Sequence, residues 1–294
     1  MRRALLFSCA LAACSNASSA PSDAATDATV DAGPIGGDRP LALFRAPDGW
    51  DQKTPLPLLL VVHGYGIGGY AQAIYFNVLP LVEEQQIIVA APDGTLDSAG
   101  KRFWNAVDAC CDFDGKNVDD VKYLTGLVDE IAARVPVDRK RVWLLGHSNG
   151  GAMSMRLACD RSKTFAAVFE LAGPFWSNPA AQCAPETPIA IRVVHGTADA
   201  TVPYDGGAKI APRSAPEIAA FFASKNGCGA QPSAGAPLDL EANLPGAETV
   251  VSRYDGCAAG GDVELWSITG GEHIPNLAPG FRAIVWDYFS KHAR

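Results

Sequence analysis

One serine stands between two glycines in the segment G-H-S-N-G, residues 146–150, directly after an apolar run from Val142 to Leu145. The pattern G-x-S-x-G is typical of a sharp turn between a strand and a helix, where strand and helix pass too close for side chains beside the serine. Good helix formers continue from Ala152 to Ala158, which fits this context. Such a turn would present the hydroxyl of Ser148 in a cleft as a nucleophile.

A serine hydroxyl becomes a good nucleophile only when a histidine accepts its proton and a carboxylate orients that histidine. On a turn of this kind the chain order is serine, acid, histidine. That order excludes the histidines that precede any suitable acid: His63, His147 and His195. His292 lies near the end of the last predicted helix, where a solvated position is the simplest expectation. His273 follows G-G-E in a loop after a buried strand, so we expect it to be the base.

The best candidate for the acid is Asp199, which follows the apolar strand predicted at residues 189–194. Asp205 and Glu272 are its rivals. Asp205 lies beyond Pro203 and further from the strand end, and Glu272 adjoins the histidine in sequence and would point away from it. We therefore expect Asp199 to complete the triad.

Ester or amide cleavage at such a serine also needs N–H donors that meet the developing oxyanion. In this arrangement one donor is the residue after the nucleophile, and the other comes from an early loop after a strand. These residues are Asn149 and, in the segment H-G-Y-G at residues 63–66, Tyr65. The sequence predicts an oxyanion hole made by their backbone N–H groups.

The segments that must position these residues alternate between buried strands and helices. Strands are predicted at residues 56–62, 87–91, 142–145, 166–172, 189–194, 249–254 and 263–268, and helices at 70–84, 120–133, 152–158, 216–224 and 281–292. This order indicates an α/β fold with a mostly parallel central sheet and helices on both faces. The candidate site residues all follow strand ends, where such folds place functional loops.

The N-terminus reads as an export signal. Residues 1–13 resemble a bacterial lipoprotein signal, with two arginines, a short apolar segment and the sequence L-A-A-C at its end. Cys14 would then be lipidated and become the first residue of the mature protein. An ordinary secretory signal cut near Ala20 is the alternative. Residues 14–40 are rich in Ser, Ala and Asp with few large apolar side chains, so we expect a disordered tether, followed by one catalytic domain at 41–294.

Composition excludes some classes of function. The formal net charge is −8, so the basic surface of a nucleic-acid-binding protein is absent. No H-E-x-x-H motif or close cysteine and histidine spacing indicates a metal site, and the acidic segment at 112–120 departs from the calcium-binding loop pattern. We expect a monomer without a cofactor, which touches a membrane only through its lipid anchor.

An ordered set of short motifs extends over nearly the whole domain. The matching segments are H-G-Y-G (63–66), P-D-G (92–94), W-N (104–105), C-C (110–111), V-D-D-V (118–121), G-H-S-N-G-G (146–151), H-G-T-A-D with V-P-Y (195–204) and G-G-E-H (270–273). With these residues the chain resembles α/β-hydrolases of the exported polyhydroxybutyrate depolymerase and feruloyl esterase type. The resemblance implies a secreted carboxylesterase with the triad Ser148, Asp199 and His273. Such proteins usually carry Trp-Pro after the histidine, where this chain has Ile274 and Pro275.

The cysteines outside the leader are even in number, as in many exported proteins. Six are involved: Cys110, Cys111, Cys159, Cys183, Cys228 and Cys257. Their places relative to the predicted strands favour pairing Cys228 with Cys257 and Cys159 with Cys183. The adjacent Cys110 and Cys111 remain as a vicinal disulfide or as thiols, and the family resemblance favours the disulfide.

The predicted function is therefore hydrolysis of an ester, polymeric (a polyester or plant-wall ester) or small, by an enzyme anchored at the bacterial cell surface. Trp104 and Tyr204 are the candidate substrate contacts, although Trp104 serves equally well as a loop anchor. A serine peptidase of the prolyl-oligopeptidase kind is one alternative, but it usually carries a large additional N-terminal domain. A non-catalytic binding module is the other, and it would be expected to lose triad residues.

Overall fold

The computed structural model of the protein describes residues 33–294. The predicted signal at residues 1–13, the lipidation site at Cys14 and the tether up to residue 32 lie outside the described residues. Among the helices in the described range, none is both long and apolar enough to cross a membrane.

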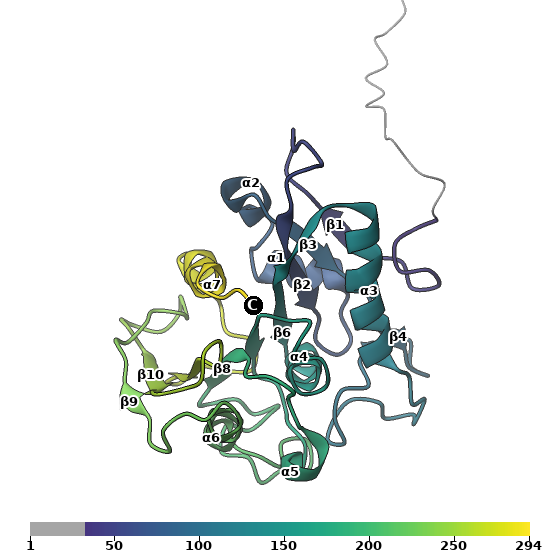
Figure 1. Ribbon diagram of the computed structural model, residues 1–294. Helices are drawn as coiled ribbons and strands as arrows, with labels where there is room; N and C mark the ends of the chain where they lie inside the picture. The colour runs from purple at the N-terminus through teal and green to yellow at the C-terminus, as the bar shows by residue number, and fades with distance from the viewer. Residues whose placement is uncertain (1–32) are drawn as a thin grey trace, which may run out of the picture. The chain divides into compact units, whose positions relative to one another are not determined.

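A nine-stranded sheet runs through residues 43–268 in the order β1-β3-β2-β6-β7-β8-β11-β10-β9 (Figure 1). The strands are β1 (Leu43–Arg45), β2 (Leu56–Val62), β3 (Ile88–Ala91), β6 (Val137–His147), β7 (Ala167–Leu171), β8 (Ala190–Gly196), β9 (Ser233–Ala234), β10 (Thr249–Tyr254) and β11 (Val263–Ile268). Neighbours from β3 to β11 pair in parallel, and β1, β10 and β9 add antiparallel edges. A small antiparallel hairpin, β4 (Thr95–Leu96) and β5 (Arg102–Phe103), lies apart.

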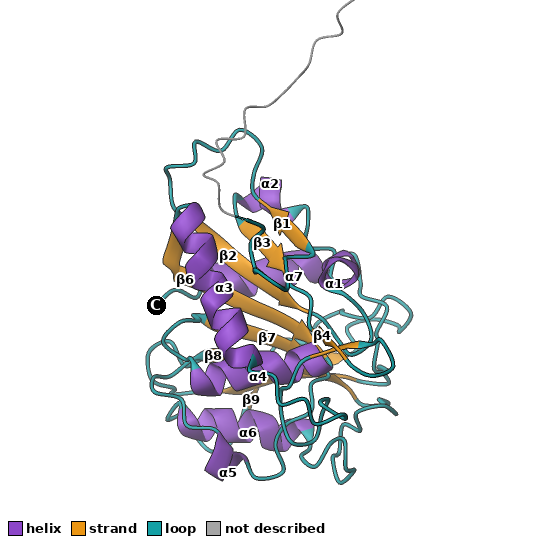
Figure 2. Ribbon diagram, turned by 90° about the vertical axis from the view of Figure 1, so that its right-hand side faces the viewer, coloured by secondary structure: helices purple, strands orange, loops and turns teal. Residues whose placement is uncertain are grey.

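Helices cover both faces of this sheet (Figure 2). They are α1 (Gly69–Tyr75), α2 (Leu81–Gln85), α3 (Asp120–Arg134), α4 (Asn149–Asp160), α5 (Pro179–Gln182), α6 (Ala215–Lys225) and α7 (Phe281–Ser290). Along β2, Leu58 and Leu60 pack into the core shared with α3, α4 and α6, while Leu59 and Val61 pack into the core shared with α1 and α7. This alternation follows from the two-residue repeat of a strand, and both faces are buried, as the continuous apolar run predicts.

One predicted helix is in fact two. Residues 70–84 divide into α1 and α2, with an irregular segment between them in which Asn77 has a positive φ of 52°. Pro80 ends this segment at the start of α2, since a proline interrupts the hydrogen bonds of a helix interior but fits its first turn.

The predicted start of the domain at residue 41 is wrong. The backbone N–H of Gly36 donates to Glu130 on α3 at 2.9 Å, and the Arg39 guanidinium binds Asp120 at 2.7 Å. Residues 34–40 therefore belong to the folded unit. The composition of this segment suggested a tether because it has few large apolar side chains. The segment is held mainly by hydrogen bonds and an ion pair instead.

Three disulfides join the cysteines in the pairing that the sequence favours: Cys228 with Cys257, Cys159 with Cys183, and Cys110 with Cys111. The first links the end of α6 to the turn before β11, which leads to the His273 loop. The second links the end of α4, the helix after Ser148, to the residue after α5. Two of the bonds thus brace the elements that carry the candidate site.

Replacing both Cys228 and Cys257 with serine should lower the melting temperature by about 5–15 °C. The bond spans 29 residues, and closing such a loop stabilises a domain by about 3–4 kcal/mol in the chain-entropy model. Calorimetry of the double variant beside a Cys110→Ser/Cys111→Ser variant checks this, because a bond between neighbours constrains the unfolded chain little. An unchanged melting temperature in the Cys228/Cys257 variant would contradict the stabilising role.

Candidate active site

Ser148 occupies the sharp turn between β6 and α4. Its backbone has φ 54° and ψ −121°, and its N–H donates to the carbonyl of Leu171 on β7 at 2.7 Å. A Cβ at Gly146 would lie 2.3 Å from the Gly150 oxygen, and a Cβ at Gly150 only 2.1 Å from the Val62 oxygen. Both glycines are required because α4 starts so close to β6 and β2, as the G-x-S-x-G pattern predicts.

The structure brings Ser148, His273 and Asp199 together at the carboxyl ends of parallel strands. The His273 Nε2 atom lies 3.0 Å from Ser148 Oγ, and its Nδ1 atom lies 2.7 Å from Asp199 Oδ2. Asp199 and His273 follow β8 and β11, which are parallel neighbours, so their loops leave the same edge of the sheet. The rival acids Asp205 and Glu272 are exposed, and the carboxylate that binds the histidine is that of Asp199.

Asp199 is held as a buried carboxylate. Its Oδ1 atom accepts the backbone N–H groups of Thr201 and Val202 at 2.8 Å each, and its Oδ2 atom lies 3.2 Å from His195 Nε2 as well as near His273. Burial acts to raise the pKa of Asp199, but the hydrogen bonds from His195, His273 and Val202 outweigh it and hold the pKa well below its usual range. An ionised Asp199 accepts the Nδ1 proton of His273, which leaves Nε2 to face Ser148.

The side chains of His147 and Tyr75 bind the backbone of the His273 loop. Chain order excluded His147 as the catalytic base, and the sequence indicated no role for Tyr75. His147 is buried, and its Nε2 atom lies 2.9 Å from the backbone oxygen of His273. Since a carbonyl only accepts, Nε2 of His147 carries the proton, and burial lowers the pKa of this ring to about 4. Tyr75 on α1 donates its hydroxyl to the carbonyl of Pro275 at 2.8 Å. Both contacts are long-range in sequence, so no local pattern indicates them.

The loop after β2 lies beside the nucleophile. A Cβ at Gly64 would come within 3.5 Å of the Ser148 Cβ atom. The next residue, Tyr65, and the first residue of α4, Asn149, have backbone N–H groups without an acceptor among residues 33–294. Two N–H groups at the start of a helix and in an adjacent loop are suited to bind a negative oxygen.

Comparison with known proteins bears on this site. A family model described as Phospholipase/Carboxylesterase matches residues 51–215, more than half of the chain. The chain belongs to this family. It is an α/β-hydrolase and a serine hydrolase that acts on carboxylic esters.

The chain is also similar to curated relatives and to a solved structure. Feruloyl esterase D of Neurospora crassa is 27% identical over 266 residues, which cover 84% of this chain and 80% of that protein. Feruloyl esterase B of Piromyces equi is 30% identical over 214 residues, 68% of this chain but 35% of that longer protein. Among solved structures, an acetyl xylan esterase from Aspergillus awamori superposes with a TM-score of 0.59 at 17% identity, covering 84% of this chain and 92% of its own, and so shares the fold.

Trp104 of this carboxylesterase is a loop anchor, so its predicted role as a substrate contact is wrong. The side chain is fully buried. Its indole N–H donates to the His63 carbonyl at 3.0 Å, while its backbone N–H donates to Asn149 Oδ1 at 2.7 Å and its carbonyl accepts from Asn149 Nδ2 at 2.9 Å. Trp104 therefore connects the loop after β2 with the first residue of α4.

The remaining predicted residues have more modest surroundings. Tyr204 is half-buried, and its hydroxyl lies 2.7 Å from Ser267 Oγ; contact with substrate stays a prediction. His292 is largely covered rather than solvated, because it packs at the end of α7 with Nδ1 2.7 Å from the Tyr288 carbonyl and Nε2 3.3 Å from Asp262. It makes no contact with the triad. Within the described range no group of three or more His, Cys, Asp or Glu side chains could hold a metal ion.

Glu170 lies within the apolar run of β7 and is completely buried behind the serine turn. Its Oε2 atom accepts the Gly173 N–H at 2.8 Å, and its Oε1 atom has no partner in the described part of the chain. A Cβ at Gly151 would lie 3.0 Å from Oε2, so the carboxyl group packs against the first turn of α4. Burial raises the pKa of Glu170 to about 8, against the opposing effect of backbone hydrogen bonds.

The thermal stability of the carboxylesterase should fall as pH rises toward 8, and Glu170→Gln should reduce that fall. The native protein keeps the Glu170 proton up to about pH 8, whereas the unfolded chain releases it near 4.5. The native state therefore binds more protons between these values, and its free energy of unfolding decreases with pH. Melting temperatures from pH 5 to 9 test this, with the exposed Glu186→Gln as control. Parallel curves for wild type and Glu170→Gln would rule out the effect.

Proposed function

We propose that Ser148 is the nucleophile of this esterase, His273 its general base and Asp199 the group that orients the histidine. The observation that carries this proposal is the unbroken path from Ser148 Oγ to His273 Nε2 at 3.0 Å and from His273 Nδ1 to Asp199 Oδ2 at 2.7 Å. The N–H groups of Tyr65 and Asn149 are proposed to hold the oxyanion.

The reaction follows from these positions. Ser148 Oγ bonds to the ester carbonyl carbon as its proton passes to His273 Nε2, and the carbonyl oxygen becomes an anion facing the two N–H donors. When the tetrahedral intermediate collapses, the bond to the alcohol oxygen breaks and the alcohol takes the proton from His273. Water then repeats both steps on the acyl-enzyme, which releases the acid and restores the serine hydroxyl. Asp199 stays ionised throughout and stabilises the charged imidazolium.

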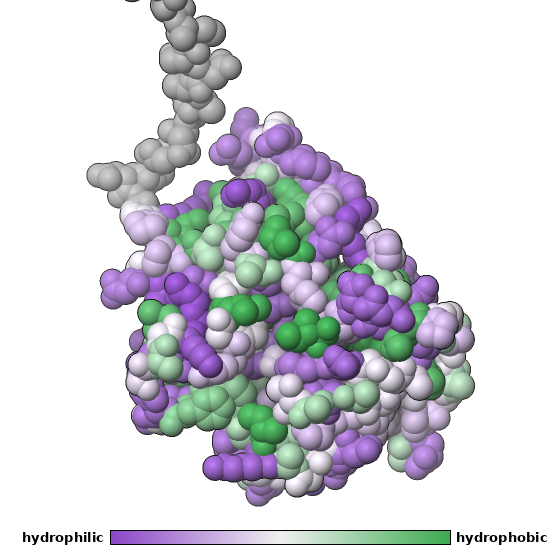
Figure 3. All heavy atoms as spheres, turned by 180° about the vertical axis from the view of Figure 1, so that it is seen from behind, coloured by the Kyte–Doolittle hydropathy of each residue, from purple (hydrophilic) through white to green (hydrophobic). Residues whose placement is uncertain are grey.

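The proposed substrates are esters of aromatic or short aliphatic acids with sugars, the feruloyl type in particular. Two of the relatives are named feruloyl esterases. Ile274, directly after His273, is 65% exposed, and Tyr70 and Ile74 are exposed one turn apart on α1. Tyr75, the last residue of α1, binds the His273 loop at the Pro275 carbonyl, and these exposed apolar side chains are the proposed contacts for the acid part of the substrate. The face toward which the parallel strands point carries apolar patches between polar ones, which suits an acid with an apolar body (Figure 3).

A substrate panel tests the function. The panel contains short-chain acyl esters, feruloyl and acetyl sugar esters, hydroxybutyrate oligomers as the polyester candidate, and peptides. We expect turnover of feruloyl and short acyl esters and none of the peptides. Cleavage of peptides without cleavage of any ester would favour the peptidase alternative and sink the proposal.

The proposed location is the outer surface of a bacterial cell envelope, with the protein held by a lipid on Cys14. The three disulfides support export, because such bonds persist mainly in oxidising compartments. Cys14→Ser should release the protein from membranes in its native host without changing the specific activity of what remains. Finding the wild type entirely in the soluble fraction would remove the anchor from the proposal.

A further inference from the structure

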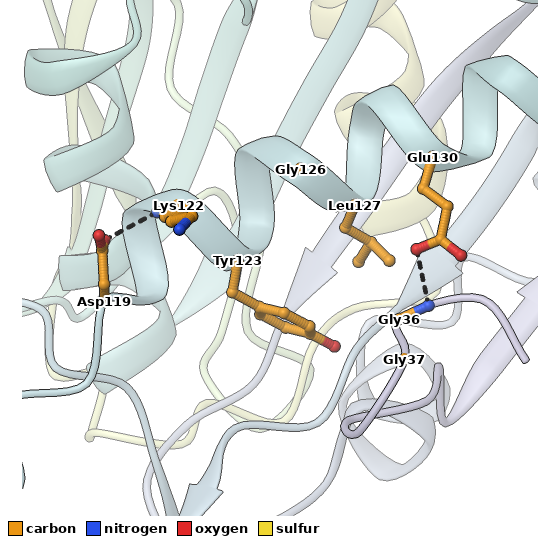
Figure 4. Close-up of a pocket in the computed structure, with 8 residues that line it drawn as sticks. All are labelled: Gly36, Gly37, Asp119, Lys122, Tyr123, Gly126, Leu127 and Glu130. Carbon is orange, nitrogen blue, oxygen red and sulfur yellow. Dashed lines mark hydrogen bonds between the residues drawn. The ribbon is translucent and has the colours of Figure 1, made fainter.

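The N-terminal segment of the domain lies along α3 as a strap, which we define as residues 34–40. Glu130 accepts the Gly36 N–H at one end of it, and the Tyr123 hydroxyl donates to the Arg39 carbonyl at 2.6 Å at the other. Figure 4 shows Tyr123 and Glu130 projecting from α3 beside Gly36 and Gly37. Strap and helix border an open surface pocket of about 450 Å³, and none of the triad residues line it.

The side chain of Arg39 leaves the strap and enters the domain. Its Nη1 atom lies 2.7 Å from Asp120 Oδ1 and 2.9 Å from Thr95 Oγ1. Its guanidinium carbon stands 3.6 Å above the centre of the Tyr123 ring and 5.9 Å from that of Trp104. Because the Asp120 side chain is completely buried, removing its cationic partner would leave a carboxylate poorly compensated in the interior.

Asp120 passes this contact on to the segment that carries Trp104. Its second oxygen, Oδ2, accepts the backbone N–H of Asn105 at 2.8 Å, and the side-chain Nδ2 of Asn105 donates to the Val118 carbonyl at 3.0 Å. Arg156 on α4 supports the same segment from the other side through the Asn105 carbonyl at 2.7 Å. The backbone at residues 104–105 is thus fixed between α3 and α4.

Trp104 connects this fixed segment to both sides of the proposed oxyanion hole. Asn149, whose side chain binds the backbone of Trp104 in both directions, supplies one of the two N–H donors. His63, whose carbonyl accepts the indole N–H, is two residues before Tyr65, which supplies the other. The His63 ring also packs on the indole, with ring centres 4.8 Å apart. A displacement of Trp104 would therefore move both donors.

We infer that Arg39 is a positioning residue for the oxyanion hole, acting through Asp120, Asn105 and Trp104. The inference rests on the serine-esterase mechanism proposed above. Oxyanion donors act at about 2.7–3.1 Å from the negative oxygen of the transition state, so a small displacement weakens that state more than it weakens substrate binding. The strap thereby contributes to the rate of the reaction, although it contacts no substrate.

The test is Arg39→Gln in the full chain. We expect kcat to fall about 10- to 100-fold with KM changed less than about twofold, somewhat less than the loss of a whole oxyanion donor. The kcat of Arg39→Lys should lie between those of wild type and Arg39→Gln, because lysine supplies the charge for Asp120 but not the planar group over Tyr123. Arg45→Gln is the matched control, since the exposed Arg45 side chain binds only the Phe44 carbonyl among residues 33–294. Its rates should equal those of wild type.

A boronic acid inhibitor separates positioning from a general loss of stability. Its adduct with the serine places a negative oxygen in the oxyanion hole, so its inhibition constant should rise in Arg39→Gln by the factor by which kcat/KM falls. Unchanged kcat in folded Arg39→Gln, or a loss that appears only in KM, overturns the inference. If Arg39→Gln does not fold, Tyr123→Phe replaces it as the test, because this change frees the Arg39 carbonyl without leaving a buried charge unpaired. The same two measurements, kcat against KM and the inhibition constant of the boronic acid, then decide. Failure of the proposed function itself would be distinct, because wild type would then neither hydrolyse esters nor react with a fluorophosphonate.

Discussion

Replacing Ser148 with alanine is expected to lower kcat/KM for ester hydrolysis by about four to six orders of magnitude. The hydroxyl is the atom at 3.0 Å from His273 Nε2, and without it the acyl-enzyme cannot form. Folding should be unaffected, because the backbone conformation of the turn is fixed by Gly146, Gly150 and the hydrogen bond to Leu171 rather than by the serine side chain. Initial rates on a chromogenic short-chain ester, with melting curves of both proteins, measure the two quantities.

The control for Ser148→Ala is Ser290→Ala, which removes an exposed hydroxyl that only contacts the Asp287 carbonyl at 3.2 Å. It should retain wild-type rates. A fluorophosphonate should label wild type and Ser290→Ala and fail to label Ser148→Ala. Near-normal hydrolysis by a folded Ser148→Ala protein would show that the nucleophile lies elsewhere.

The sequence predicted the carboxyl edge of the sheet well because the relevant signals are local. The apolar run of β2 and the glycines around Ser148 each describe a segment of a few residues whose conformation has few alternatives. Chain order left two histidines and three acids, and their positions relative to the strand ends then favoured His273 and Asp199. The late strands at 249–254 and 263–268 coincide with β10 and β11 because both are short segments bounded by turn residues. Buried residues in β10 are separated by more exposed ones, whereas β11 is largely buried.

The strap was not predictable because its contacts are distant in sequence. Arg39 reaches a carboxylate 81 residues away, and Gly36 reaches a glutamate 94 residues away. A segment with few large apolar residues can still be ordered when long-range hydrogen bonds and one buried ion pair fix it. Composition measures only the apolar contribution, and it therefore placed the start of the domain several residues too late.

The role of Trp104 illustrates a second limit. An aromatic residue in a loop near an active site is compatible with either a substrate platform or an anchor, because sequence does not tell which way the ring points. Complete burial and the bonds to His63 and Asn149 decide for the anchor. His147 is a similar case. Its place in the serine motif suggested no function, yet its ring supports the backbone of His273.

Replacing His273 with alanine should be about as damaging as removing the serine, with kcat/KM reduced by roughly five to six orders of magnitude. Without the imidazole no group accepts the Ser148 proton or returns it to the leaving alcohol. Initial rates of wild type and His273→Ala on the same chromogenic ester measure the loss. The variant should fold, since Asp199 keeps its bonds to His195, Thr201 and Val202.

His292→Ala provides the matched comparison for His273→Ala. His292 lies at the end of α7, bonded to Tyr288 and close to Asp262, so its loss should cost some stability and leave kcat/KM within about twofold of wild type. Initial rates of both variants on the same ester, with their melting curves, distinguish the two histidines. Of the two rings, that of His273 lies within hydrogen-bonding distance of Ser148. A severe loss of rate in His292→Ala beside a nearly normal His273→Ala would therefore show that the base had been assigned to the wrong residue.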